Sequence, residues 1–437
     1  KVRRSLSLRR TLLPYFSRAR PAWPAGATLV LAAALTTLAS AQTAPPPPIP
    51  ENTNPSRQSP SLREALDAAW TLIPSARGTE NRRAEAQARE RAASSWINGA
   101  PSVLIAQSTD RFNGNAGYRE LAAELELPIW SPGVRDATQR ELTAQREAFE
   151  PQQTLARLKV AAEVREAAAN VAMALTERDL ATRKHGEALA LARDVERRVK
   201  AGDSARVDGL QAQSLVQHAA SARQLADAAL SRQLNHWITL TGLSGAPLLD
   251  EAPPPASPVV GASHPAIEAA QARVQATQAK LALTEADKRD PMTVGIGATR
   301  ERSVYGAASD TRVNLALKIP FGTDNRNGAR IASARAELDE AQAELDAVQR
   351  QTRGDVASAL AELDAARSAQ AATVERARLA QEIQSLVARS YRLGESDLPT
   401  RLRADGERFE ADLALARASV GVQRAISQLN QALGLLP

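Results

Sequence analysis

The stretch Tyr-Arg-Leu-Gly-Glu-Ser-Asp-Leu-Pro at residues 391–399 places a glycine turn between two long segments of helical composition. A related stretch, Arg-Val-Lys-Ala-Gly-Asp-Ser, occupies residues 198–204. Shifting the chain against itself by 192 residues aligns the turn glycines, Gly202 and Gly394. The same shift aligns two further pairs, Pro128 with Pro320 and Gly242 with Gly434. Agreement of three such pairs on one offset predicts a duplicated unit.

Composition limits the class of fold. Only 3% of the 437 residues are aromatic, which is too few for an ordinary globular core of this size. Alanine, leucine, glutamate, arginine and glutamine dominate instead, as is typical of long helices packed through small side chains. The absence of cysteine excludes disulfides, thiol catalysis, thiolate metal sites and a lipid anchor on an N-terminal cysteine.

Residues 1–41 have the pattern of a cleaved export signal. Basic residues precede an apolar run at 25–38, and small residues follow at 39–41. The apolar run is too short to span a bilayer, and a membrane anchor is the alternative. Seven Lys and Arg residues and no acidic residue lie in this segment, so its removal changes the formal net charge from +6 to −1. The basic balance therefore belongs to the signal and not to a nucleic-acid-binding surface.

The rest of the chain divides into linkers and two repeats. Residues 42–60 are rich in proline and predict an extended linker. A capping box at Ser61 and Glu64 begins the first helix, which is expected to bend at Pro74. The predicted boundaries are a first helix/hairpin repeat at 61–245, a linker at 246–263 and a second repeat at 264–437.

Each repeat contains a pair of strands. Residues 118–127 and 311–319 alternate apolar and polar side chains, which predicts strands with one apolar face. Weaker candidates at 102–112 and 292–302 precede them through glycine-bearing loops, so each repeat is expected to form a hairpin. Strands of about ten residues are long enough to cross a bilayer. The alternative is a small soluble sheet that caps a helical bundle.

Long helices follow each hairpin. About seventy residues of helical pattern run from Pro128 and Pro320 toward the turn glycines, which corresponds to about 100 Å of helix. A shorter helix then returns to Gly242 or Gly434. The first helix of each repeat is therefore expected to stack end to end with a return helix. Trp96 and Trp130 lie at strand–helix junctions, where an aromatic ring suits the lipid headgroup level.

This arrangement resembles the TolC family of outer-membrane efflux channels. The resemblance covers the chain from Ser61 to Gly434 and is most specific at 198–204, at 391–396 and at the strand-to-helix junctions. The junction Ile-Pro-Phe-Gly-Thr-Asp-Asn-Arg-Asn at 319–327 is similar to that of the CzcC-like heavy-metal efflux branch.

The resemblance implies a mainly α fold with a membrane β-barrel part. Two β-hairpins from each chain of a homotrimer would close one twelve-stranded barrel in the outer membrane of a Gram-negative cell. The long helices would continue it as a coiled-coil barrel across the periplasm. Such a passive conduit has no cofactor and receives substrate, in the heavy-metal branch metal cations, from an inner-membrane pump through a periplasmic adaptor.

The same resemblance places adaptor docking at the two turns. Glycine adopts the left-handed conformation at little cost, so the motif is also explained as the chemistry of a sharp turn alone. The polar residues after each glycine, Asp203, Ser204, Glu395, Ser396 and Asp397, are expected to cap the following helix. The predicted docking residues are Arg198, Val199, Ala201, Gly202, Ser204, Tyr391, Arg392, Gly394 and Ser396.

The resemblance also implies a periplasmic gate on the helix after the second turn. Pro399, Arg403 and Gly406 share one face at helical spacing. Relatives commonly carry an aspartate at the position aligned with Arg403, so a ring of carboxylates would need Asp397 or Asp405 instead. The alternative is a solvated helix face. The predicted gate residues are Asp397, Pro399, Arg403, Asp405 and Gly406.

Other chemistry finds little support in the sequence. The four histidines share no zinc-type spacing, which favours structural or solvated roles over a metal site. A phosphate loop, a serine elbow and a catalytic triad are all missing, so an enzyme is not expected. The competing function is a periplasmic coiled-coil scaffold or adaptor without a pore, which would be soluble once the signal is removed.

Overall fold

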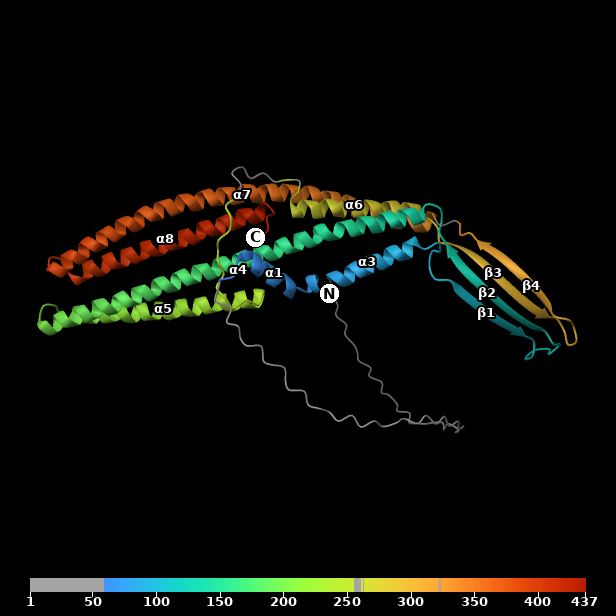
Figure 1. Ribbon diagram of the computed structural model, residues 1–437, viewed down its shortest axis with the longest axis horizontal. Coiled ribbons are helices and arrows are strands. Elements are labelled where there is room, and N and C mark those ends of the chain that lie inside the picture. The colour runs from blue at the N-terminus through green and yellow to red at the C-terminus, as the bar shows by residue number, and fades with distance from the viewer. Residues whose placement is uncertain (1–58, 255–260, 262, 322–323) are drawn as a thin grey trace, which may run out of the picture. The chain divides into compact units, whose positions relative to one another are not determined.

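The computed structural model describes residues 59–254, 261, 263–321 and 324–437. The predicted export signal, most of the 42–60 linker and parts of the 246–263 linker and the 319–327 motif lie outside the described residues. Helix, hairpin, long helix and return helix occur twice in that order (Figure 1). The first pass comprises α1 (Leu62–Leu72), α2 (Pro74–Arg77), α3 (Thr79–Ser94), β1 (Ser102–Thr109), β2 (Arg119–Ile129), α4 (Val134–Ala201) and α5 (Arg206–Thr241). The second comprises α6 (Pro265–Ala286), β3 (Met292–Arg302), β4 (Asp310–Lys318), α7 (Asp324–Leu393) and α8 (Leu398–Ala432).

The helices begin and end where the sequence predicts. The capping box of α1 is formed, since Ser61 Oγ accepts from the Glu64 amide at 3.2 Å and Glu64 Oε2 accepts from the Ser61 amide at 2.9 Å. At Pro74 the structure shows a break between α1 and α2, because the residue before a proline disfavours helical geometry. α4 and α7 contain 68 and 70 residues, and the return helices α5 and α8 contain 36 and 35. Within the described part of the chain, no helix combines the length and apolar character needed to span a membrane.

The return helices meet the first helices end to end, as predicted. α5 ends at Gly242, which lies against Leu72 at the end of α1. α8 ends close to Gly434, which lies against His264 and Pro265 at the start of α6. α4 packs along α5, α6 and α8, and α7 packs along α6 and α8 (Figure 1). Each long helix is thus accompanied over its length by a shorter helix from the same repeat.

Alanine provides much of the buried surface between these helices, together with a few large side chains. One core joins α1, α4 and α5 around Leu66, Val164 and Trp237, all at most 1% exposed. A second joins α7 and α8 around Leu363 and Leu429. A third lies at the helix turns. The small aromatic content is therefore compatible with close packing, because short side chains let helix backbones approach.

The strands form one antiparallel sheet in the order β1-β2-β3-β4. Both predicted hairpins are present, and the central pair β2–β3 joins the two repeats. β1 ends at Thr109, before the predicted Phe112, because the amides of Asn113 and Asn115 turn back onto the Asp110 carbonyl. Pro128 was expected after the strand, where the segment that leads into the long helix begins. It lies instead within β2, where its carbonyl accepts from the Asn98 amide at 2.8 Å.

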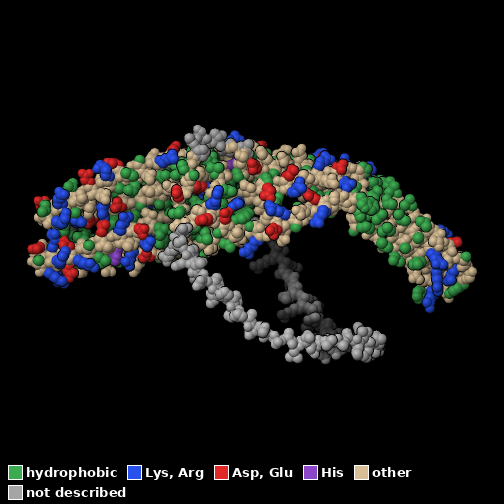
Figure 2. Space-filling model, in the orientation of Figure 1, with side chains coloured by type: hydrophobic (Ala, Val, Ile, Leu, Met, Phe, Trp, Pro, Cys, Tyr) green, Lys and Arg blue, Asp and Glu red, His purple; other side chains and the backbone are tan. Residues whose placement is uncertain are grey.

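Register places apolar residues of all four strands on one face. In β1 to β4 respectively, this apolar face contains Val103 and Ile105; Leu121, Ala123, Leu125 and Leu127; Val294, Ile296 and Ala298; and Val313, Leu315 and Leu317. Ile105, Val313 and Leu315 are 71%, 78% and 78% exposed, so no helix covers this face. Figure 2 shows the resulting concentration of hydrophobic side chains over the sheet. A soluble sheet capping a bundle would have turned these side chains toward the helices.

The opposite face of the sheet is polar. It carries Glu120, Glu124 and Glu126 of β2, next to Gly295 and Gly297 of β3. A Cβ at Gly295 would lie 2.7 Å from Glu124 Oε1, so the glycine leaves the space in which that carboxylate rests. Apart from its hairpin-loop end, the sheet therefore keeps carboxylates on one face and a continuous row of apolar side chains on the other, as the alternating sequence predicts.

Candidate functional site

The first helix turn is built on Gly202. Its φ of +85° lies in the left-handed region that favours glycine, and its amide donates to the Val199 carbonyl at 3.2 Å. The Asp203 amide donates to the Arg198 carbonyl at 2.8 Å, which completes a Schellman-type helix end. Asp203 and Ser204 do not cap α5 as expected. The Asp208 carboxylate does so by accepting from the Ala205 amide at 3.1 Å.

The second turn repeats this geometry at Gly394. Its φ is +78°, its amide donates to the Tyr391 carbonyl at 3.2 Å, and the Glu395 amide donates to the Ser390 carbonyl at 3.0 Å. Asp397 is the N-cap of α8, with Oδ1 accepting from the Thr400 amide at 3.0 Å. Hydrogen bonds from Thr400 lower the pKa of Asp397 below its usual value. The Ser396 hydroxyl is buried and has no hydrogen-bond partner among the described residues.

The two turns pack against each other through Tyr391. Its ring is 6% exposed and lies with Val195, Ala212 and Leu398 in an apolar cluster drawn from both repeats. The guanidinium of Arg198 stacks 4.8 Å from the ring centroid. Burial raises the pKa of the Tyr391 hydroxyl. Arg198 and Tyr391, predicted separately as docking residues, are thus in direct contact.

The predicted docking residues differ in accessibility. Tyr391 is buried, and the half-buried ones are Arg198, Val199, Ser204 and Ser396. The exposed ones are Ala201, Gly202, Arg392 and Gly394. Three exposed apolar side chains nearby were not predicted, namely Leu393, Val207 and Leu210, at 67%, 56% and 57% exposure. The signal available in the sequence was the occurrence of leucine and valine within or beside otherwise polar turn motifs.

The predicted gate residues lie on different sides of α8. Pro399 and Arg403 are exposed, and Gly406 is half-buried. Asp405 turns toward α7, where it accepts from Gln384 Nε2 at 2.7 Å and pairs with Arg401 at 3.0 Å. Its side chain is only 16% exposed. Asp397 is exposed and caps α8, and the charge of Arg403 also acts on its carboxylate.

Ion pairs join α8 to α4 along the seam between the repeats. Arg408, Arg417 and Arg424 of α8 pair with Glu187, Glu177 and Glu166 of α4. The Arg417–Glu177 pair measures 2.7 Å. These pairs were not predicted, because partners on separate repeats share no local sequence pattern.

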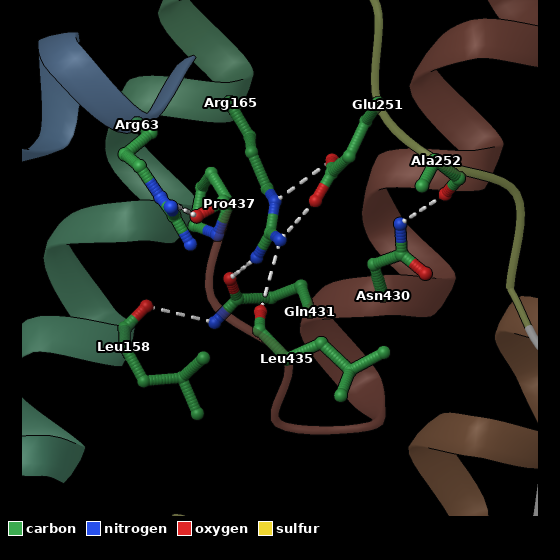
Figure 3. A network of polar contacts seen from close by, with 9 residues as sticks. All are labelled: Arg63, Leu158, Arg165, Glu251, Ala252, Asn430, Gln431, Leu435 and Pro437. Carbon is green, nitrogen blue, oxygen red and sulfur yellow. Dashed lines mark hydrogen bonds and ion pairs between the residues drawn. The ribbon is translucent and has the colours of Figure 1, made fainter.

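A buried polar network also connects the repeats (Figure 3). Arg165 of α4 is 4% exposed and binds both carboxylate oxygens of Glu251, which follows α5. It also donates to Gln431 Oε1 at 2.5 Å and to the Leu435 carbonyl at 2.9 Å. Nearby, Asn430 Nδ2 donates to the Ala252 carbonyl at 2.9 Å. This Arg165 network holds the segment after α5 and the end of α8 onto α4.

Metal-binding side chains are scattered in the described part of the chain, where no group of three or more His, Asp or Glu residues could hold a metal ion. His264 caps α6 by accepting from the Ala266 amide at Nδ1, and burial lowers its pKa. His218 and His236 are exposed, and His185 is half-buried. Trp237, next to His236, is completely buried.

Residues 260–435 match the family model of the outer membrane efflux protein. The second repeat, termed the efflux domain, is thus similar to this family. This efflux domain includes the second turn, α8 and the β3–β4 hairpin. A search of curated proteins finds no match.

Solved structures share the fold of the efflux domain and of the repeat before it. CusC superposes with a TM-score of 0.71 at 17% identity, covering 86% of this chain and 92% of that chain. VceC, an outer membrane protein of Vibrio cholerae, superposes with a TM-score of 0.67 at 19% identity. The match covers 85% of this chain and 96% of VceC. The CmeC outer membrane channel of Campylobacter jejuni superposes with a TM-score of 0.67 at 16% identity, and the match covers 85% of each chain. The predicted resemblance to the TolC family and the predicted fold class are confirmed, and the CzcC-like branch stays a prediction.

Proposed function

We propose that this chain is the outer-membrane channel of a tripartite efflux system. The observation that carries the proposal is the uncovered apolar face of the sheet. It lies on the same chain as two helices of 68 and 70 residues, each followed by a return helix. An uncovered apolar surface of this extent marks contact with lipid or protein. A periplasmic scaffold gives no reason for it, and a channel requires no catalytic residue or cofactor.

Three copies would close the sheet. β1 and β4 are its edges, and unpaired edges within a bilayer are not tolerated. Two copies would give about eight strands, a number whose interior side chains fill, whereas three copies give about twelve and leave an open bore. The polar face with Glu120, Glu124 and Glu126 would line that bore.

The helices offer surfaces for the same assembly. Within the described chain, α4 packs on α8 of the other repeat, but α7 makes no comparable contact with α5. α7 instead exposes an apolar line of Leu379, Ile383 and Leu386, at 45–58% exposure. In a homotrimer this line would meet α5 of the next protomer and continue the α4–α8 seam around the ring.

Adaptor docking is proposed at the exposed parts of the two turns. Leu393, Val207 and Leu210 add apolar contact area beside Gly202 and Gly394, which suits a protein partner. An inner-membrane pump would deliver substrate through that adaptor. We expect Leu393→Asp to weaken pull-down of the adaptor from the native envelope without changing the oligomeric mass. Undiminished adaptor recovery and undiminished efflux would remove the docking proposal.

Metal cations are the proposed cargo. Two observations support this proposal: the resemblance of 319–327 to the heavy-metal branch and the glutamates of the polar face. Periplasmic gating at Pro399, Arg403 and Gly406 likewise stays a proposal, supported by the exposure of Pro399 and Arg403.

The proposed function is tested by the mass and conductance of the purified protein. The expected result is a detergent-requiring trimer that forms cation-conducting pores in planar bilayers. A monomer that stays soluble in plain buffer and leaves bilayers silent would overturn the channel and favour the scaffold.

A further inference from the structure

Three arginines stand at the hairpin-loop end of the apolar face. Arg119 of β2 lies directly opposite Arg302 of β3, and Arg300 lies opposite Leu121. Residues directly opposite one another in a sheet share a face, so this arginine cluster continues the row of Leu121, Ala123 and Leu125. Figure 2 shows Lys and Arg side chains gathered beyond the hydrophobic surface of the sheet.

The nearby carboxylates do not neutralise the cluster. Glu120, Glu301 and Asp310 belong to the polar face of the sheet. Glu120 accepts from the Tyr118 hydroxyl at 2.5 Å, and Glu301 pairs with Arg312 at 3.4 Å. Among the described residues, Arg119 and Arg300 have no ion-pair partner, and both are exposed.

Arg302 is held in place without being neutralised. Its Nε donates to the Gly117 carbonyl at 3.3 Å, and its guanidinium lies 5.6 Å from the centroid of Tyr305. Like charges directly opposite one another in a sheet are destabilising. Three adjacent guanidinium groups on one face therefore form a site that an anion would stabilise.

Aromatic residues mark both limits of the apolar face. Phe112 and Tyr305, at 93% and 59% exposure, lie in the hairpin loops. Trp96 and Phe321, at 66% and 89%, lie at the helix end of the sheet. Exposed aromatic rings are characteristic of the lipid headgroup level. The arginine cluster is thus at the level of one layer of headgroups, where an arginine on the lipid side costs far less than at the midplane.

We propose that the arginine cluster binds phosphate groups of anionic lipid in the leaflet on the hairpin-loop side of the membrane. The inference rests on the proposed function, which puts the apolar face in lipid. Planar guanidinium groups pair with phosphate oxygens through two parallel hydrogen bonds. Because β2 and β3 are the central strands of the sheet, each protomer holds a complete site.

The test uses the purified full chain in nanodiscs of phosphatidylcholine that contain a minor fraction of lipid A with its two phosphate groups. Native mass spectrometry counts the lipid A retained by the wild type, by Arg119→Gln/Arg300→Gln and by Arg312→Gln on the polar face. Each arginine near an anionic surface contributes about fivefold in affinity, so the double variant is expected to bind about thirtyfold more weakly. Arg312→Gln is expected to match the wild type.

Four other results would overturn the inference. Equal retention of lipid A by the double variant, in a protein that still conducts, would remove the lipid site and leave the channel. Equal retention of dephosphorylated lipid A by the wild type would show that acyl chains and not phosphates are recognised. Inorganic phosphate that displaces lipid A at micromolar concentration would assign the cluster to a free anion. A protein that does not enter nanodiscs would remove the proposed function as well.

Discussion

At the offset of 192 residues, the cores of the two repeats use equivalent positions. Val164, Ala167 and Val171 of α4 correspond to Val356, Ala359 and Leu363 of α7, and all are buried. Trp237 of α5 corresponds to Leu429 of α8, and both are completely buried. The surroundings differ, because α1 adds Leu62 and Leu66 to the first core and α6 adds no side chain to the second. The repeats therefore share a backbone plan and differ in how its volume is filled.

The same offset pairs Arg165 with Ala357. Arg165 is buried in its network, whereas Ala357 is exposed. The residues after α8 and the segment after α5 cover Arg165, whereas nothing in the described chain covers Ala357. The two repeats therefore share the arrangement of their helices, whereas the buried polar network at their junction is built on the first repeat's position alone.

The largest loss of unfolding free energy is expected from Arg165→Ala, which removes the network found in one repeat and not in the other. It leaves Glu251, whose side chain is 9% exposed, without its partner, and breaking a buried pair costs about 3–5 kcal/mol. Urea unfolding of the detergent-solubilised protein, followed by circular dichroism, measures the loss. Arg165→Leu/Glu251→Leu is the matched control and is expected to be nearly neutral, since both charges are removed. Equal destabilisation by the single and double variants would show that the ion pair is not the cause.

The cores are compared by Trp237→Ala and Leu429→Ala. We expect the free energy of unfolding to fall by about 3–5 kcal/mol for Trp237→Ala and by about 2–5 kcal/mol for Leu429→Ala. In the same urea assay, the loss should be larger for the tryptophan variant. Leu429→Trp should also destabilise, by about 1–3 kcal/mol, because the second core lacks the space. A Leu429→Trp protein as stable as the wild type would mean that the two cores have the same volume.

Gly242 and Gly434 sharpen the comparison at the helix ends. Both have positive φ, 72° and 76°, so alanine at either costs about 1–2 kcal/mol in backbone conformation. A Cβ at Gly434 would also lie 2.6 Å from Pro265 Cδ, whereas at Gly242 the nearest atom, Leu72 Cδ1, is 3.6 Å away. Gly434→Ala is therefore expected to lower the melting temperature more than Gly242→Ala. The reverse order would argue against the close contact between α8 and α6.

The smallest effect is expected at the caps of the return helices. Asp397 corresponds to Ala205, so only the second turn has an acidic N-cap. Because the folded-state pKa of Asp397 is lowered, its stabilisation is present above the pKa of the unfolded chain and is lost as pH falls through the folded pKa. Asp397→Asn should keep the cap without this acid dependence. Melting temperatures of wild type and Asp397→Asn across pH 3–7 test it, and parallel curves would contradict the assignment.

The sequence predicted the architecture well because its signals are local. Glycine at the turns, alternation in the strands and the capping box at Ser61 each depend on a few neighbouring residues, and each appears in the structure. The misplacement of Pro128 has a local reason too, since a proline at the end of a strand looks the same as one in the turn after it.

The site was less predictable because its contacts join distant segments. Arg165 lies among many helical arginines, and only the fold shows that Glu251 and Gln431 surround it. Tyr391 was recognised as part of a turn, but its burial depends on Val195 and Ala212 of the other repeat. Asp405 shares α8 with Arg403, and its orientation is decided by Gln384 on α7.

The pairing of β2 with β3 has a consequence for how the chain folds. Its partners are separated by α4, α5 and α6, so this is the most non-local contact in the sheet. Such contacts form slowly, because the intervening chain must first be ordered. The helical hairpins are therefore expected to fold before the sheet does. The unpaired edge strands of the sheet would then form only after the helices are in place to align neighbouring chains.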